Sequence, residues 1–65
     1  MARYIRFALD RRGEILCADE VRCAGDDEAR DYLNELQARF PAGEIWSTGR
    51  LVAGFGGPLQ SARSG

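Results

Sequence analysis

The residues that could carry covalent or acid–base chemistry are few in this 65-residue chain, which holds two cysteines, ten carboxylate side chains and no histidine. All nine basic residues are arginines. The chain therefore lacks the most common general base, and it lacks the amine needed for a Schiff base or a lysine phosphate clamp. Two cysteines are also fewer ligands than a closed tetrahedral zinc site needs. We expect a non-enzymatic protein without a metal or a cofactor.

The two cysteines, Cys17 and Cys23, lie in a segment that begins as an extended strand. An unbroken strand would separate their Cα atoms by about 20 Å, whereas a disulfide tolerates about 7 Å. A bridge would require a tight turn at "ADE", residues 18–20. We therefore expect reduced, structural thiols.

Two other short motifs have structural explanations. The acidic "DDE" of residues 26–28 matches the first turn of a helix, where carboxylates interact favourably with the helix dipole. The glycines of "GFGG", residues 54–57, follow the last predicted strand and precede no helix, so they do not form the usual phosphate-binding loop. Neither motif predicts catalysis.

The chemistry that the sequence does offer is recognition by aromatic, arginine and aliphatic side chains on predicted strands. Such residues are enriched at the centres of protein interfaces. The candidate protein-binding residues are Tyr4, Arg6, Leu16, Trp46, Arg50 and Val52. They form one surface only if the strands place them on one face of a sheet, so the elements that position them come next.

The first two strands are predicted to form a hairpin. "RYIRFALD" alternates between apolar and other residues, and "DRRG" matches a type I turn closed by a left-handed glycine. Counting outward from that turn gives the pairs Leu9–Ile15, Ala8–Leu16, Phe7–Cys17 and Arg6–Ala18, with an end or a bulge of the pairing at "ADE". On this register Ile5, Phe7 and Leu9 face the helix, while Tyr4 and Arg6 face outward.

A helix is predicted over "GDDEARDYLNELQARFP", from a cap at Asp26 to Pro41. One apolar stripe follows its three- and four-residue spacing, comprising Ala29, Tyr32, Leu33, Leu36 and Phe40. Glu35 and Arg39 are placed to pair at i, i+4. The start of the helix forms a second candidate surface of acidic residues, made of Asp26, Asp27, Glu28 and Asp31.

The second hairpin, "EIWSTGRLVAGF", allows two registers with opposite consequences for Trp46. A two-residue turn at Thr48–Gly49 pairs Trp46 with Leu51 and places the indole in the core. A three-residue loop, residues 47–49, pairs Trp46 with Arg50 on the outer face as a cation–π pair. We favour the second register because its helix-facing set, Ile45, Leu51, Ala53 and Phe55, is entirely apolar.

Together these elements predict an α+β domain of ββαββ order over residues 1–55, with an antiparallel sheet of two hairpins and one helix packed on one face. Residues 56–65 are predicted to be a disordered tail, because they are rich in glycine and serine. One helix covers one face of such a sheet. The other face would then carry the candidate protein-binding residues.

Residues 3–55 resemble short uncharacterised proteins of proteobacterial type. The resemblance is carried by "DDEARDYLNELQARFPAGEIW" followed by "GRLVAGF". It implies a compact cytoplasmic domain and transfers no catalytic residue.

We expect the partner to be a protein or a second copy of the chain. One alternative is a phage- or mobile-element-encoded inhibitor that acts through the acidic helix end, where residues 13–31 carry seven acidic and two basic side chains, a charge of −5. Another is an RNA-binding sheet with aromatic stacking, which the net charge of −1 disfavours. No apolar run has the length of a membrane span, so we expect a cytoplasmic location.

Overall fold

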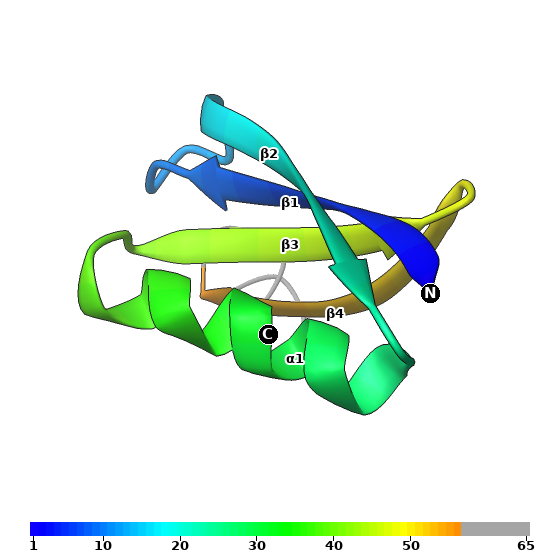
Figure 1. The fold of residues 1–65 in the computed structure, drawn as a ribbon. Coiled ribbons are helices and arrows are strands. Elements are labelled where there is room, and N and C mark those ends of the chain that lie inside the picture. The colour runs from blue at the N-terminus through cyan, green and yellow to red at the C-terminus, as the bar shows by residue number, and fades with distance from the viewer. Residues whose placement is uncertain (57–65) are drawn as a thin grey trace, which may run out of the picture.

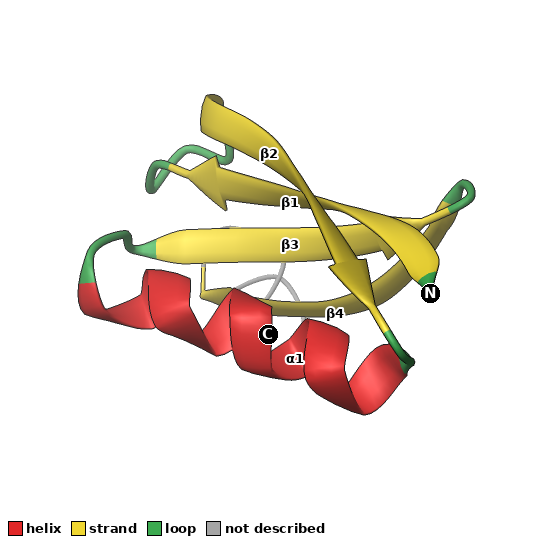
Figure 2. Ribbon diagram, in the orientation of Figure 1, coloured by secondary structure: helices red, strands yellow, loops and turns green. Residues whose placement is uncertain are grey.

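The computed structural model describes residues 1–56 and contains one four-stranded antiparallel sheet with a helix on one of its faces (Figures 1 and 2). The elements are β1 (Ala2–Leu9), β2 (Ile15–Cys23), α1 (Asp26–Asn34), a 3-10 turn η1 (Glu35–Ala38), β3 (Ala42–Ser47) and β4 (Arg50–Gly56). The strand order is β2-β1-β3-β4, so the first strand of each hairpin lies at the centre of the sheet. The predicted ββαββ fold is confirmed.

The first turn follows the prediction. The Asp10 N–H donates to the Glu14 carbonyl at 2.9 Å, and the Gly13 N–H donates to the Asp10 carbonyl at 3.0 Å. Gly13 adopts a φ of 88°, the left-handed conformation that glycine reaches without a steric penalty. The Asp10 carboxylate also accepts from the N–H groups of Arg12 and Glu14, at 2.8 and 2.9 Å. The aspartate at the first turn position therefore holds the loop by itself.

The register beyond that turn differs from the prediction. Leu9 pairs with Ile15 as expected, but a bulge then makes Leu16 an extra residue, and Ala8 pairs with Cys17. The shift places Arg6 opposite Asp19, and the strand continues to Cys23 without the expected interruption at "ADE". A shift of one residue reverses the face on which paired side chains lie, so β1 turns Tyr4, Arg6 and Ala8 toward the helix, while Cys17 and Ala18 of β2 keep their predicted faces.

The second turn has two residues, so the favoured three-residue loop is wrong. Thr48 and Gly49 have φ angles of 50° and 76°, the pair of positive values that defines a type I′ hairpin turn. Trp46 accordingly pairs with Leu51. Val52 is then the extra residue of a second bulge, after which Ile45 pairs with Ala53. This bulge returns Ala53 and Phe55 to the helix side and leaves Trp46 on the outer face.

The helix buries its predicted stripe but begins and ends differently than expected. Its N-cap is Gly25 and no side chain caps it, so Asp26 is the first helical residue and not the cap. The α-helix ends at Asn34 and tightens into the 3-10 turn η1, which breaks the spacing of the predicted Glu35–Arg39 pair. Ala29, Leu33 and Leu36 are buried, and Tyr32 and Phe40 pack against them.

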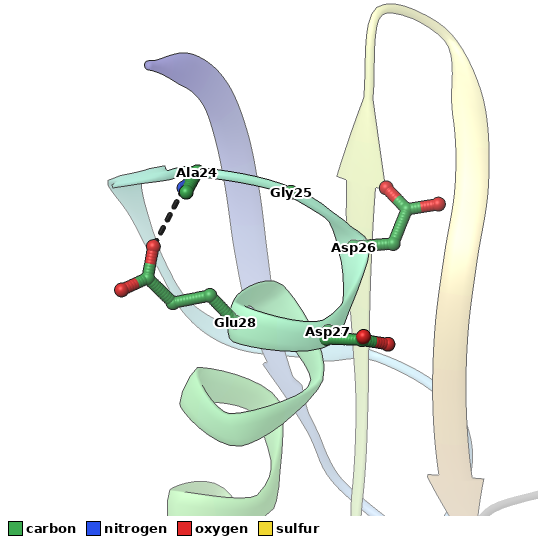
Figure 3. A pocket seen from close by; sticks show the side chains of 5 residues that line it. All are labelled: Ala24, Gly25, Asp26, Asp27 and Glu28. Carbon is green, nitrogen blue, oxygen red and sulfur yellow. Dashed lines mark hydrogen bonds between the residues drawn. The ribbon is translucent and has the colours of Figure 1, made fainter.

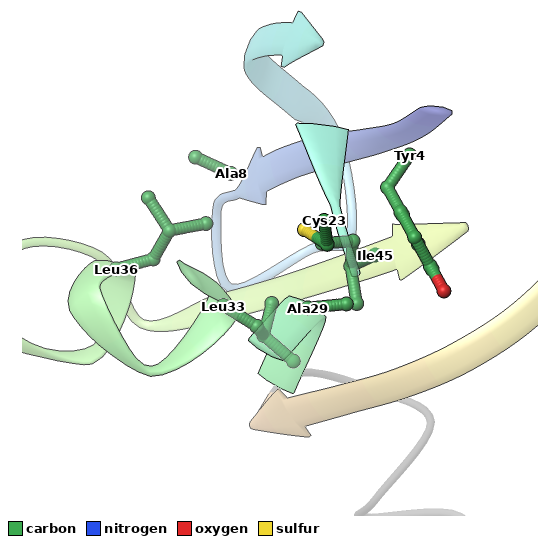
Figure 4. Close-up of a cluster of buried hydrophobic side chains, with 7 residues drawn as sticks. All are labelled: Tyr4, Ala8, Cys23, Ala29, Leu33, Leu36 and Ile45. Carbon is green, nitrogen blue, oxygen red and sulfur yellow. The ribbon is translucent and has the colours of Figure 1, made fainter. Parts of the chain in front are cut away.

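The core between helix and sheet combines small and large apolar side chains (Figure 4). Its buried cluster comprises Tyr4, Ala8, Cys23, Ala29, Leu33, Leu36 and Ile45. Around it pack Val21, Tyr32, Phe40, Val52, Ala53 and Phe55. Alanine and glycine on the facing strands let the helix lie close to the sheet, and the larger side chains of β4 and the helix fill the remaining space.

Other features of the chain complete the fold. Both cysteines are free, Cys17 being exposed and Cys23 buried, as expected from their separation. Burial raises the pKa of the Cys23 thiol. No helix in residues 1–56 combines the length and apolar character that crossing a bilayer requires. Of the predicted tail, Gly56 is the last residue of β4, and residues 57–65 lie outside the described part of the chain.

Gly43 generates a prediction about this close packing. A Cβ atom at Gly43 would lie 2.6 Å from Phe55 Cε1 and 3.2 Å from Leu36 Cδ1. We expect Gly43→Ala to lower the free energy of unfolding by about 1–3 kcal/mol, measured by urea denaturation, because overpacking forces neighbours off their rotamers. In a Phe55→Leu background the same change should cost less, since the nearest ring atom is gone. Equal costs in both backgrounds would contradict this packing.

Candidate protein-binding face

The register assigns each strand residue to one of the two faces of the sheet. Side chains directly opposite one another share a face, and successive residues alternate. The face turned away from the helix comprises Arg3, Ile5, Phe7 and Leu9 on β1, Ile15, Ala18, Glu20 and Arg22 on β2, Ala42, Glu44 and Trp46 on β3, and Leu51, Gly54 and Gly56 on β4. We call this set the outer face.

The centre of the outer face is apolar and partly accessible. Ile5, Phe7 and Trp46 are half-buried, and none of them belongs to the core cluster or to the hydrophobic residues that pack against it. Ala18 is exposed and Leu51 is 40% exposed. At one end of this face Leu9 and Ala42 are already buried. The accessible part is therefore an apolar patch on the two central strands and their neighbours.

The charged groups of the outer face make ion pairs or hydrogen bonds within the chain. The Arg3 guanidinium Nε lies 2.8 Å from Glu20 Oε2, and Arg22 Nε lies 3.9 Å from the same oxygen. On the other side, the indole N–H of Trp46 donates to Glu44 Oε1 at 2.9 Å. Two arginines and two glutamates give this face a formal charge of zero. The hydrogen bond to Glu44, two residues earlier on the same strand, also restricts the orientation of the Trp46 indole.

The structure divides the candidate protein-binding residues between the two faces. Trp46 lies on the outer face, as predicted, although by a different turn from the one favoured. Leu16 is exposed at the bulge in β2, 55% accessible. Tyr4 is only 3% exposed and belongs to the core, and Val52 packs against that core. Their predicted outward positions are wrong because the β1–β2 bulge and the Val52 bulge each change the register by one residue.

Arg6 also lies on the helix side, where it joins the sheet to the end of the helix. Its Nε and Nη2 donate to the two oxygens of Asp19 at 3.0 and 2.6 Å. Its Nη1 donates to the carbonyl of Tyr32 in the last helical turn at 2.9 Å and to Glu35 Oε1 at 3.3 Å. A cation at the carboxyl end of a helix is favourable for the dipole. The arginine lowers the pKa of the Asp19 carboxyl through its hydrogen bonds.

Arg50 does not stack on Trp46, because it joins a second polar cluster at the start of the helix. The two oxygens of Asp26 each lie 3.3 Å from an Arg50 nitrogen. The Tyr4 hydroxyl donates to Asp26 Oδ1 at 2.8 Å. The hydrogen bonds of Arg50, and then that of Tyr4, lower the pKa of the Asp26 carboxyl, while the bond to Asp26 raises the pKa of Tyr4. Asp26 therefore links β1, β4 and α1.

The other acidic residues of the helix start also have local contacts (Figure 3). Glu28 turns back along the chain, and its Oε1 accepts from the Ala24 N–H at 2.6 Å. The Asp27 carboxylate lies 3.3 Å from Arg30 one turn later. The second candidate surface of Asp26, Asp27, Glu28 and Asp31 is thus largely a set of helix-start contacts, and Asp31 is its one exposed member without such a contact among the described residues.

Sequence reasoning placed Ala18 correctly on the outer face but missed Ile5, Phe7 and Leu51. The signal that could have found the first two was the charge pattern. Arg6 and Asp19 carry opposite charges and become directly opposite only after a one-residue bulge near the turn. That pairing puts Arg6 under the helix and its neighbours, Ile5 and Phe7, on the outer face.

Comparison of the chain with protein-family models, with curated proteins and with solved structures gives no match. The function is therefore argued from the geometry of the chain.

The Asp26 cluster generates a prediction about pH. The pKa of Asp26 in the folded protein is lowered from its ordinary value of 3.8, so the carboxylate contributes stability above that value and loses it as the pH falls through the lower folded pKa. We expect Asp26→Asn to destabilise the protein at neutral pH and the difference from wild type to shrink below about pH 4, followed by thermal unfolding with circular dichroism.

The matched control is Asp31→Asn, the same change on an exposed position of the same helix. It should leave stability nearly unchanged at neutral pH. A destabilisation by Asp26→Asn that stays constant from neutral to acid pH would contradict the role given to the Asp26 charge.

Proposed function

We propose that this protein is a non-enzymatic domain that binds another protein through the outer face of its sheet. The observation that carries the proposal is a group of large apolar side chains outside the core. Ile5, Phe7 and Trp46 lie on the face turned away from the helix, and none of them belongs to the core cluster or to the hydrophobic residues packed against it. A small domain has little apolar surface to spare for its own stability, so bulky apolar residues on a sheet face that no helix of residues 1–56 covers mark an interaction site.

The composition of the outer face supports a protein partner. Its centre is apolar and aromatic, and at its rim Arg3 and Arg22 lie next to Glu20 in ion pairs that are already formed, as in the core and rim of protein interfaces. Trp46 is the strongest anchor candidate, since tryptophan is enriched among residues that dominate binding energy. Its bond to Glu44 holds the ring in one orientation and so lowers the entropy lost on binding.

The charge of the outer face argues against nucleic acid. Phe7 and Trp46 lie on the two central strands, which is where stacking platforms for bases lie in RNA-binding sheets. However, nucleic-acid affinity depends on a positive surface, and the arginines here are balanced by Glu20 and Glu44. An inhibitor acting through the acidic helix end is less well supported, because Asp26, Asp27 and Glu28 make local contacts.

The titratable groups with shifted pKa values support the absence of catalysis. Tyr4, Arg6, Asp19, Asp26 and Arg50 all belong to the two ion-pair clusters that fasten the helix to the sheet. The remaining one is the buried thiol of Cys23. Perturbed pKa values often mark active sites, but structural ion pairs perturb them as well, and here each shift has such a partner or burial as its cause.

Site-specific photo-crosslinking tests this proposal in cells that normally make the protein. A benzophenone amino acid replaces Leu51, which is exposed on the outer face, or Gln37, which is exposed on the helix side. We expect illumination to join the Leu51 variant to a protein and to leave the Gln37 variant uncrosslinked, because only the first position lies in the proposed interface.

Circular dichroism of both variants controls for folding. A nuclease-sensitive adduct at Leu51 would favour the RNA-binding alternative. Crosslinks of equal yield from both positions, or none from Leu51, would contradict binding through the outer face.

A further inference from the structure

We infer that the protein that covers the outer face is a second copy of this chain, packed sheet against sheet about a two-fold axis. This inference rests on the proposed function and names its partner. Two properties of the outer face favour a second copy, its shape and its charge, and its size sets the strength of the contact.

The shape of the outer face fits another twisted sheet. The four strands twist together across the fold, as Figure 1 shows for β2 against β3. Sheets share one hand of twist, so two of them pack face to face with their strands about 30° apart and about 10 Å between the layers. A second copy supplies such a sheet with the same twist. Ile5, Phe7 and Trp46 then interdigitate with their counterparts, as in the core of a β-sandwich.

The charge of the outer face permits contact with itself. In a two-fold interface the same patch occurs on both sides, so a face with net charge would repel its copy. Here the two arginines and two glutamates sum to zero, and Arg3 and Arg22 both lie next to Glu20 within the chain. The ion pair of Arg3 with Glu20 lies beside the apolar centre and stays at the rim. Glu44 lies next to Phe7 at the centre of the face, where its carboxylate keeps the hydrogen bond from the Trp46 indole when two copies meet.

The size of the outer face sets the strength of the contact. An eight-residue strand and four strands span about 26 Å by about 19 Å, or roughly 500 Å² in projection. Stable interfaces bury about 800 Å² on each partner, and smaller ones are typical of transient complexes. The contact should therefore be a reversible dimer with a dissociation constant of about micromolar order.

Sedimentation velocity of the full chain tests the inference. We expect the wild-type protein to pass from monomer to dimer between about 1 µM and about 1 mM. Ala18→Arg places a charge on an exposed position of the outer face and should weaken the dimer at least about tenfold. Gln37→Arg adds the same side chain on the helix side and should dimerise like wild type. Leu51→Arg is a second outer-face variant for the case in which Ala18→Arg does not fold.

Acrylamide quenching of Trp46, the only tryptophan, adds a local measurement. Quenching should decrease as the wild-type dimer forms and remain constant in the Ala18→Arg variant. A wild-type protein that stays monomeric over the whole range would overturn the inference. So would a dimer that Ala18→Arg and Leu51→Arg leave intact, because it would form through another surface such as the β2 edge.

The failure of this inference differs from the failure of the proposed function. A monomeric protein whose Leu51 variant crosslinks to a different protein retains the outer face as a binding site and loses only the second copy. A crosslinked product of twice the chain mass of 7.2 kDa agrees with both. A monomeric protein whose Leu51 variant gives no crosslink would contradict both the dimer and the outer face as a binding site.

Discussion

The pairing of Arg6 with Asp19 is the constraint on which the rest of the structure depends. It requires the bulge at Leu16, and that bulge decides which side chains of β2 point toward the helix. An exposed ion pair would contribute little, but the Arg6 side chain is only 16% exposed and needs partners for its charge. Asp19, the Tyr32 carbonyl and Glu35 supply them. With Arg6 under the helix, the alternation of β1 places Tyr4 and Ala8 there as well.

The same pairing decides which apolar residues of the sheet face the helix. The helix side receives Tyr4, Ala8, Cys23, Ile45 and Phe55, and the outer face receives Ile5, Phe7 and Trp46. Two polar clusters, one around Arg6 and one around Asp26, fasten the two ends of the helix to the sheet. The core is thus reinforced by hydrogen bonds, and three large apolar side chains remain on the face that we propose for binding. Fold and proposed function follow from one register.

The sequence predicted the elements well and the faces less well. Periodicity found the helix stripe, and the Asp10–Gly13 turn was predicted from the chemistry of its end residues. The errors in the assignment of faces came from two bulges, at Leu16 and at Val52. The alternation of apolar and polar residues along a strand does not reveal a single inserted residue. Each insertion reverses the face assigned to every residue paired beyond it. The predicted three-residue loop placed Trp46 on the outer face. The observed type I′ turn and the Val52 bulge together place it on that same face, so the prediction for Trp46 was correct although the predicted loop was not. Ile5 and Phe7 were missed for the same reason.

Tyr4 lies under the helix, while Ile5 and Phe7 share the other face of the sheet with Trp46. Nuclear Overhauser contacts in the labelled protein, recorded at low concentration, measure this directly. We predict contacts from the Tyr4 ring to the Ala29 methyl group and from Ile5 to the Trp46 indole, with none between the Phe7 ring and Ala29 or Leu33. Contacts from Phe7 to Leu33, together with a Tyr4 ring that has none to the helix, would contradict the account.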